Sequence, residues 1–173
     1  AHEVARWSFA ALGVSAGDAA IESLTSQFER ASHTSHVVAV EGARELLGTL
    51  ARRGVPCALV CDTGLTPGSQ VRRLLDRAGL LGGLAFCAFS DEVGVPKPAP
   101  AIFQSALDAL GIDPGDALHI GDLRRTDIAG ARAMGMRSAR LRSRMDDTSP
   151  FPEADYVVDH LETLRSAFHT LIS

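Results

Sequence analysis

The sequence predicts an α/β domain in which a parallel sheet carries helices on both faces. Short apolar runs of strand length alternate with longer amphipathic stretches over most of the chain, and this alternation is typical of βαβ units. Connections in such units are right-handed, which places the helices over the sheet. The length of 173 residues fits one domain with a small additional element.

The first 36 residues predict two helices and no strand. Val4, Trp7 and Ala11 share one face of the first helix, which Gly13 ends. The second helix carries an apolar stripe that consists of Ile21, Leu24, Phe28 and Ala31. Two amphipathic helices must bury these stripes on another part of the protein. The polar residues 32–36 then predict a hinge, and their two histidines lack the neighbouring carboxylates or cysteines of a metal site.

The remaining residues predict strands and helices in alternation. Apolar and β-branched runs predict strands at 36–40, 55–61, 84–89, 117–120, 137–141 and 156–158. Apolar residues at helical spacing predict helices at 42–54, 68–78, 99–110, after Asp127, and at 159–171. Gly54 is the last residue of one of these helices and Gly79 follows another, as expected because glycine often ends a helix. Polar loops are predicted at 90–98 and 142–153.

Three predicted strand ends carry polar residues that converge on one rim of the sheet. These are Cys61-Asp62-Thr63, Ser90-Asp91 and Gly121-Asp122. Ligands of open parallel sheets bind outside the carboxyl ends of the strands. Asp127 follows Asp122 by five residues, and two carboxylates placed there repel each other unless a cation lies nearby. Mg²⁺ suits such a site. The alternative is that Asp122 is a loop residue and Asp127 a helix cap.

Lys97 is the most informative single residue. The chain has 17 lysines and arginines in all, and Lys97 is its one lysine. This usage indicates a position that needs a compact ammonium group. Pro96 and Pro98 stiffen the backbone on either side. A lysine at the rim can neutralise a phosphate and a nucleophile together, whereas the alternative is a solvated surface lysine.

Composition excludes several classes of partner. A net charge of −4 gives no reason to expect nucleic acid or an anionic membrane surface. No apolar run approaches the roughly 18 residues of a membrane span. The three cysteines lie in apolar runs, which favours buried thiols over disulfides and a cytoplasmic location.

Three segments together resemble the second, third and fourth motifs of the haloacid dehalogenase-like (HAD) hydrolases. They are Cys61-Asp-Thr-Gly, Val95-Pro-Lys-Pro-Ala-Pro-Ala-Ile-Phe103 and His119-Ile-Gly-Asp-Leu-Arg-Arg-Thr-Asp127-Ile-Ala-Gly-Ala131. The resemblance covers roughly residues 40–142, and the order and spacing of the last two motifs are specific.

The resemblance implies a Rossmann-like core over residues 37–173, with residues 1–36 as part of a helical cap. It also implies Mg²⁺-dependent hydrolysis of a small phosphorylated substrate through an aspartyl-phosphate. Asp122 then resembles the metal ligand, and Asp127 a second acidic residue that acts through water. Lys97 resembles the residue that steadies the nucleophile and the phosphate.

The sequence departs from the family pattern at two places. Cys61 and Asp62 stand where the family usually has Ser or Thr followed by Asn, so phosphate binding would rest on backbone N–H groups or on Thr63. The first motif, an Asp-x-Asp that supplies the nucleophile and the general acid/base, is absent: no two aspartates of the chain are separated by one residue.

The absent motif also has a consequence for the fold. In the family its strand lies in the middle of the sheet, between the strand ending at Cys61 and the strand ending near Ile120. We therefore expect a core that lacks its first strand, and residues 1–173 alone should not hold the whole sheet as a soluble monomer. We expect the protein to extend upstream of Ala1. A less favoured alternative is that Val37–Val40 fills the gap.

Two functions of different class follow. The first is a HAD phosphatase whose nucleophile is missing from this chain, favoured by the joint presence of Lys97, Asp122 and Asp127. The second is a non-catalytic HAD-like domain that binds a phosphorylated metabolite or a protein, favoured by Cys61 and Asp62. A dehalogenase uses the same scaffold without a metal, and the paired acids argue against it. The oligomeric state stays open.

Overall fold

The computed structural model describes residues 2–33, 38–142 and 146–171. Its helices are α1 (His2–Ala11), α2 (Asp18–His33), α3 (Ala43–Arg52), α4 (Gly68–Arg77), α5 (Ser90–Val93), α6 (Pro100–Leu110), α7 (Ala129–Ala133) and α8 (Leu161–Leu171). Its strands are β1 (Ala58–Cys61), β2 (Phe86–Phe89), β3 (Leu118–Gly121), β4 (Arg137–Leu141) and β5 (Tyr156–Val158). The predicted α/β class is confirmed, and all described strand pairs are parallel.

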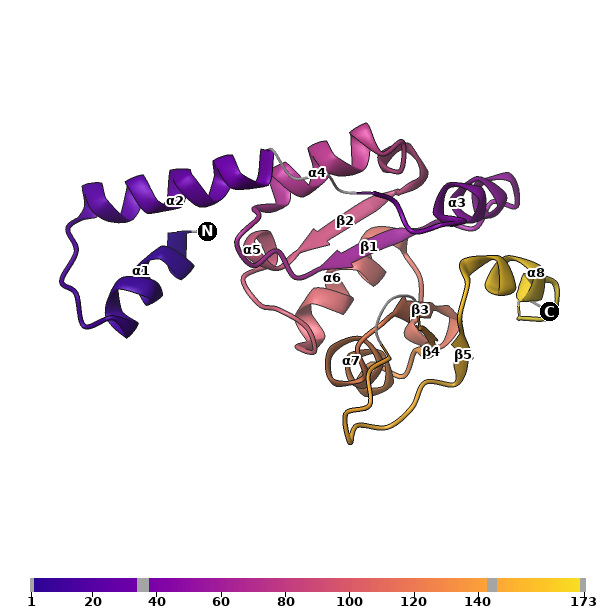
Figure 1. The fold of residues 1–173 in the computed structure, drawn as a ribbon. Coiled ribbons are helices and arrows are strands. Elements are labelled where there is room, and N and C mark those ends of the chain that lie inside the picture. Colours follow the sequence, from indigo (N-terminus) through magenta and orange to yellow (C-terminus); the bar gives the residue numbers. More distant parts are fainter. Residues whose placement is uncertain (1, 34–37, 143–145, 172–173) are drawn as a thin grey trace.

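The strands form two separate sheets (Figure 1). One contains β1 and β2, and the other contains β3, β4 and β5 in that order. Within the described residues no strand pairs with the outer edge of β1 or with the outer edge of β3. The break therefore lies at the position predicted for the missing first strand.

A cavity of about 330 Å³ lies between β1 and β3. Its lining is mainly apolar and comes from both strands and from two helices, α3 and α6. Ala58 and Val60 of β1 pack against the α6 cluster, whereas Leu118 and Ile120 of β3 pack against the α3 cluster. A strand that filled this space would meet apolar side chains on both of its faces.

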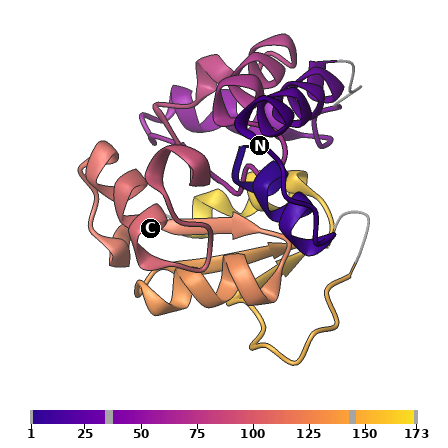
Figure 2. The same cartoon turned by 90° about the vertical axis from the view of Figure 1, so that its left-hand side faces the viewer.

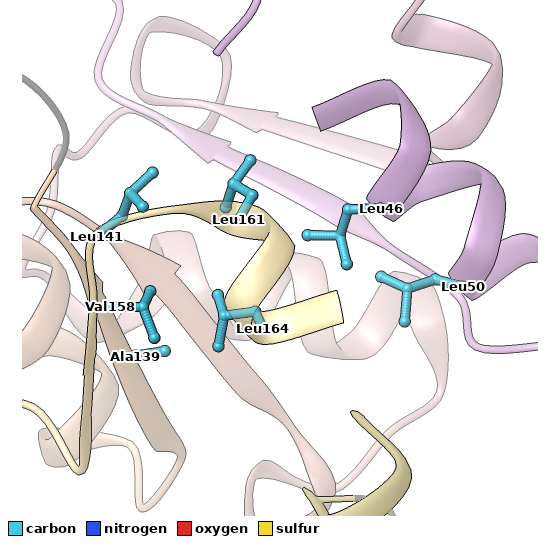
Figure 3. Close-up of a cluster of buried hydrophobic side chains, with 7 residues drawn as sticks. All are labelled: Leu46, Leu50, Ala139, Leu141, Val158, Leu161 and Leu164. Atoms are coloured by element: carbon cyan, nitrogen blue, oxygen red, sulfur yellow. The ribbon is translucent and has the colours of Figure 1, made fainter. Parts of the chain in front are cut away.

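The larger core cluster joins the second sheet to the two helices α3 and α8. It consists of Leu46, Leu50, Ala139, Leu141, Val158, Leu161 and Leu164. Figure 3 shows Leu46 and Leu50 of α3 facing Leu161 and Leu164 of α8. Leucine suits this contact because each fully buried side chain contributes about 1.5–3 kcal/mol to stability.

Helices α1 and α2 form a hairpin beside the sheets, which lies toward the viewer in Figure 2. The prediction that the face of α1 with Val4, Trp7 and Ala11 is buried is wrong. Trp7 is 70% exposed, and the buried residue of this helix is Ala5. The main contact of α1 is with α2, and Trp7 lies on a face that this contact leaves exposed. In α2 the predicted Ile21 is buried.

Three further segments refine the sequence predictions. The predicted loop 90–98 begins as the short helix α5. Residues 38–40 form no strand, with Val38 82% exposed, and residues 34–37 lie outside the described part of the chain. None of the helices that the structure describes combines the length and the apolar character needed to cross a bilayer.

Candidate active site at the carboxyl ends of the strands

Lys97 connects the carboxyl ends of β1 and β3. Its backbone N–H donates a hydrogen bond of 2.9 Å to Oδ1 of Asp62, which follows β1. Its Nζ donates a bond of 2.7 Å to Oδ1 of Asp127, which follows β3. The side chain is only 13% exposed. The structure thus brings together three residues that the sequence analysis singled out.

Asp127 is a buried carboxylate with three donors. Oδ1 accepts from Lys97 Nζ and lies 3.1 Å from His119 Nε2, and Oδ2 accepts from the Leu123 N–H at 3.1 Å. Burial raises the pKa of Asp127, but the hydrogen bond from His119 and the charge of Lys97 outweigh it and hold the pKa well below its usual range. The ionised carboxylate accepts only, so His119 Nε2 carries the proton.

The turn after β3 explains how Asp127 reaches this position. Residues Arg124–Ile128 form a π-type turn, in which the Ile128 N–H donates to the Leu123 carbonyl oxygen at 3.2 Å. Such turns are rare and frequent at functional sites. A Cβ built on Gly121 would overlap the Asp127 side chain. Glycine at 121 is therefore needed for the carboxylate to fold back against the strand end.

Asp122 is exposed at the same rim. Within the described residues no hydrogen bond or ion pair reaches its carboxylate, in contrast to Asp127. Mg²⁺ typically takes one or two carboxylates together with waters and substrate phosphate oxygens, and Asp122 fits such a role. The part of the chain described here contains no cluster of three histidine, cysteine or acidic side chains suited to a metal.

Cys61, Asp62 and Thr63 line the end of β1. Burial raises the pKa of the Cys61 thiol, and the nearby Lys97 charge lowers it by less, so the thiol stays neutral at pH 7. Thr63 is buried: its N–H donates to Ser90 Oγ at 3.0 Å and its hydroxyl lies 3.1 Å from the same oxygen. Thr63 thus faces Ser90, and the Asp62 carboxylate is paired with the Lys97 N–H.

His119 is the site residue that sequence reasoning did not single out. It lies two positions before Gly121 in β3, and side chains two apart share one face of a strand. Its ring contacts Phe103 of α6 edge to face, with centroids 5.1 Å apart. This packing holds the imidazole against Asp127. The spacing to Gly121 was the signal available in the sequence.

The chain belongs to the haloacid dehalogenase-like hydrolases. The model of this family, described as haloacid dehalogenase-like hydrolase, matches residues 14–135, which is most of the chain. The resemblance found in the three motifs is thereby confirmed.

Several known proteins are similar to this chain. Haloacid dehalogenase-like hydrolase domain-containing protein 3 of Bos taurus is 35% identical over 99 residues, which are 57% of this chain and 38% of that protein. Phosphoserine phosphatase of Thermus thermophilus is 38% identical over 96 residues, or 56% of this chain and 37% of that protein. This chain therefore spans little more than a third of either relative.

A solved structure extends the likeness to nearly the whole chain. The HAD phosphatase of Thermococcus onnurineus superimposes with a TM-score of 0.69 at 26% sequence identity. The match covers 94% of this chain and 69% of that one. The chain thus shares the fold as well as the sequence motifs of the haloacid dehalogenase-like hydrolases.

Proposed function

We propose that the protein hydrolyses phosphate monoesters of a small metabolite, with Mg²⁺, through an aspartyl-phosphate. The nucleophilic aspartate is missing from this chain and enters on a strand between β1 and β3. The observation that carries the proposal is the buried Lys97, whose backbone and side chain bind the ends of both strands at once. Phosphatases among the relatives support the same reaction class.

The residues at the rim have different proposed roles, which follow from their charges. Asp127 fixes the Lys97 ammonium at the edge of the gap, where it offsets the negative charge of the phosphate and of the incoming aspartate. Backbone N–H groups after β1 other than that of Thr63 bind the phosphate oxygens, since the Thr63 N–H and hydroxyl both already contact Ser90. Asp62, paired with an N–H, adds less repulsion than a free carboxylate would.

Asp122 would hold the metal, and Asp127 would act on it through water. A bound Mg²⁺ offsets phosphate charge during transfer and orients the substrate. The exposed Asp122 carboxylate keeps this position open to a hydrated ion. The three free cysteines support a reducing, cytoplasmic setting.

The test compares residues 1–173 with the same chain preceded by its upstream coding sequence. We expect the longer form to hydrolyse a phosphate monoester with Mg²⁺ and the shorter form to be inactive. A matched variant of the longer form, with its new nucleophile aspartate replaced by asparagine, should also be inactive. An upstream sequence without a strand that ends in Asp-x-Asp, or a longer form without activity, contradicts the proposal.

The second candidate is a non-catalytic HAD-like domain that binds a phosphorylated metabolite or a protein. It is favoured by Cys61, a weak hydrogen-bond donor with a raised pKa where the family usually has a hydroxyl. Binding of a phosphate ester without turnover in the longer form would select this candidate.

A further inference from the structure

A network of charged side chains lies behind the rim, and its centre is a buried arginine. Arg140 of β4 is 1% exposed. Its Nε donates a bond of 2.7 Å to Oε1 of Glu153, and its Nη2 donates a bond of 2.7 Å to Oε2. Its Nη1 donates to Asp146 at 2.6 Å. The planar guanidinium matches the carboxylate in both bonds. Arg140 therefore fixes Glu153 against the strand that neighbours β3.

Glu153 also binds a second arginine. Its Oε2 accepts a bond of 2.7 Å from Arg124 Nη2, and its Oε1 accepts from the Ala154 N–H at 2.9 Å. The bond from Arg140 is the main reason that the pKa of Glu153 falls to about 2. Glu153 thus stays ionised and bridges two guanidinium groups from separate elements.

Arg124 is held at both ends by the segment 146–153, which precedes β5 (Figure 1). Its backbone N–H donates to Asp147 Oδ2 at 2.6 Å, and its Nη1 donates to the Ser149 carbonyl oxygen at 3.3 Å. Asp147 is itself fixed, because its Oδ1 accepts from the Ser149 N–H at 2.8 Å. Arg124 is the first residue of the π-type turn that ends with Asp127 and Ile128.

We propose that Glu153 is a positioning residue: through Arg124 it holds the turn between Asp122 and Asp127 in the orientation that the rim requires. No hydrogen bond joins Glu153 to either acid of the turn; its carboxylate reaches the turn through Arg124, and its carbonyl oxygen also accepts a bond of 3.1 Å from Arg132 Nη1 of α7, the helix that follows the turn. The role of Glu153 in holding the turn is inferred from the contacts of Arg124 alone and does not depend on a metal. Its consequence for metal binding rests on the function proposed above.

A stabilising role alone does not explain this arrangement. Buried ion pairs replaced by well-packed apolar residues often leave stability unchanged or raise it. An apolar pair at 140 and 153 would keep β4 in place, but it would remove the carboxylate that accepts from Arg124 Nη2. Stability and turn position can therefore be separated by experiment.

The first variant is Glu153→Gln, with Glu162→Gln as its matched control. Glu162 makes a comparable two-bond pair with Arg165 on the exposed side of α8, away from the rim. In the longer form, amide hydrogen exchange is measured by mass spectrometry, and Mg²⁺ affinity by calorimetry. In Glu153→Gln we expect exchange in residues 122–128 to rise by about tenfold, and Mg²⁺ affinity to fall by about tenfold. The control should change neither by more than about twofold.

The second variant, Arg140→Met with Glu153→Leu, covers the case in which Glu153→Gln does not fold. We expect this pair to keep the wild-type melting temperature while residues 122–128 exchange about tenfold faster. If the amide hydrogens of residues 122–128 exchange at the wild-type rate in whichever variant folds, the proposal is overturned. A wild-type chain that binds no Mg²⁺ removes the proposed metal role, and the exchange measurement still decides on the positioning.

Discussion

Replacing Lys97 by methionine tests whether the ion pair at the rim is as buried as the structure indicates. Methionine has a similar length and no charge, so it leaves the Asp127 carboxylate, 4% exposed, without its cation. Removing one partner of a buried pair typically costs about 3–5 kcal/mol. Total stability of a domain is about 5–15 kcal/mol. We expect a loss in this range and a fall in melting temperature of about 6–20 °C.

The same variant has a predicted pH dependence. The pKa of Asp127 lies below its usual value in the folded protein, so its stabilising effect is present above the unfolded pKa of about 3.9 and is lost as the pH falls through the folded pKa. Without Lys97, burial raises the pKa of Asp127 against fewer opposing contacts. The acid unfolding midpoint of Lys97→Met should therefore move to higher pH.

Urea unfolding of wild type and variants with identical chain boundaries measures the loss. Arg165→Met is the control, because Arg165 makes an exposed pair with Glu162, and it should cost less than about 1 kcal/mol. The double variant Lys97→Met with Asp127→Asn should lose less than the two single variants together. A cost for Lys97→Met no larger than that of the control would refute the assignment of a buried, energetically coupled pair.

Three further results are expected. Asp122→Asn should weaken Mg²⁺ binding by about tenfold or more in calorimetry on the longer form, and unchanged affinity would exclude Asp122 as a ligand. Lys97→Arg should lower phosphate monoester hydrolysis by the longer form by about 10²–10³-fold, since the planar fork cannot take the position of a compact ammonium; wild-type turnover would contradict this. Residues 57–61 and 117–120 should exchange amide hydrogens faster in residues 1–173 than in the longer form, and equal protection would show that the gap needs no strand.

The sequence predicted the strand ends well because their signals are local. Each apolar run that ends in a polar residue marks a strand terminus, and parallel strands bring such termini to one rim. Lys97 stood out for a compositional reason, as the one lysine of the chain. Its two contacts with Asp62 and Asp127 then followed from the topology of the sheet.

Features that depend on tertiary neighbours were not predictable in the same way. The burial of Ala5 in place of Trp7 depends on which elements cover α1. The contact of Thr63 with Ser90 joins the segment after β1 to the first residue of α5, and the two residues are 27 positions apart in the sequence. Arg140 sits in a short strand as a fully buried cation, which only the acidic segment 146–153 makes acceptable. No periodicity in the sequence shows these partners.

Because Lys97 binds both sheets, the geometry of the rim depends on the separation between them. Its backbone N–H is bonded on the β1 side and its ammonium on the β3 side, so moving the sheets apart breaks the contacts that assemble the site. A molecule that binds across the rim must then favour the closed arrangement by its own binding free energy. Ligand affinity and resistance to opening should therefore rise and fall together across variants of this chain.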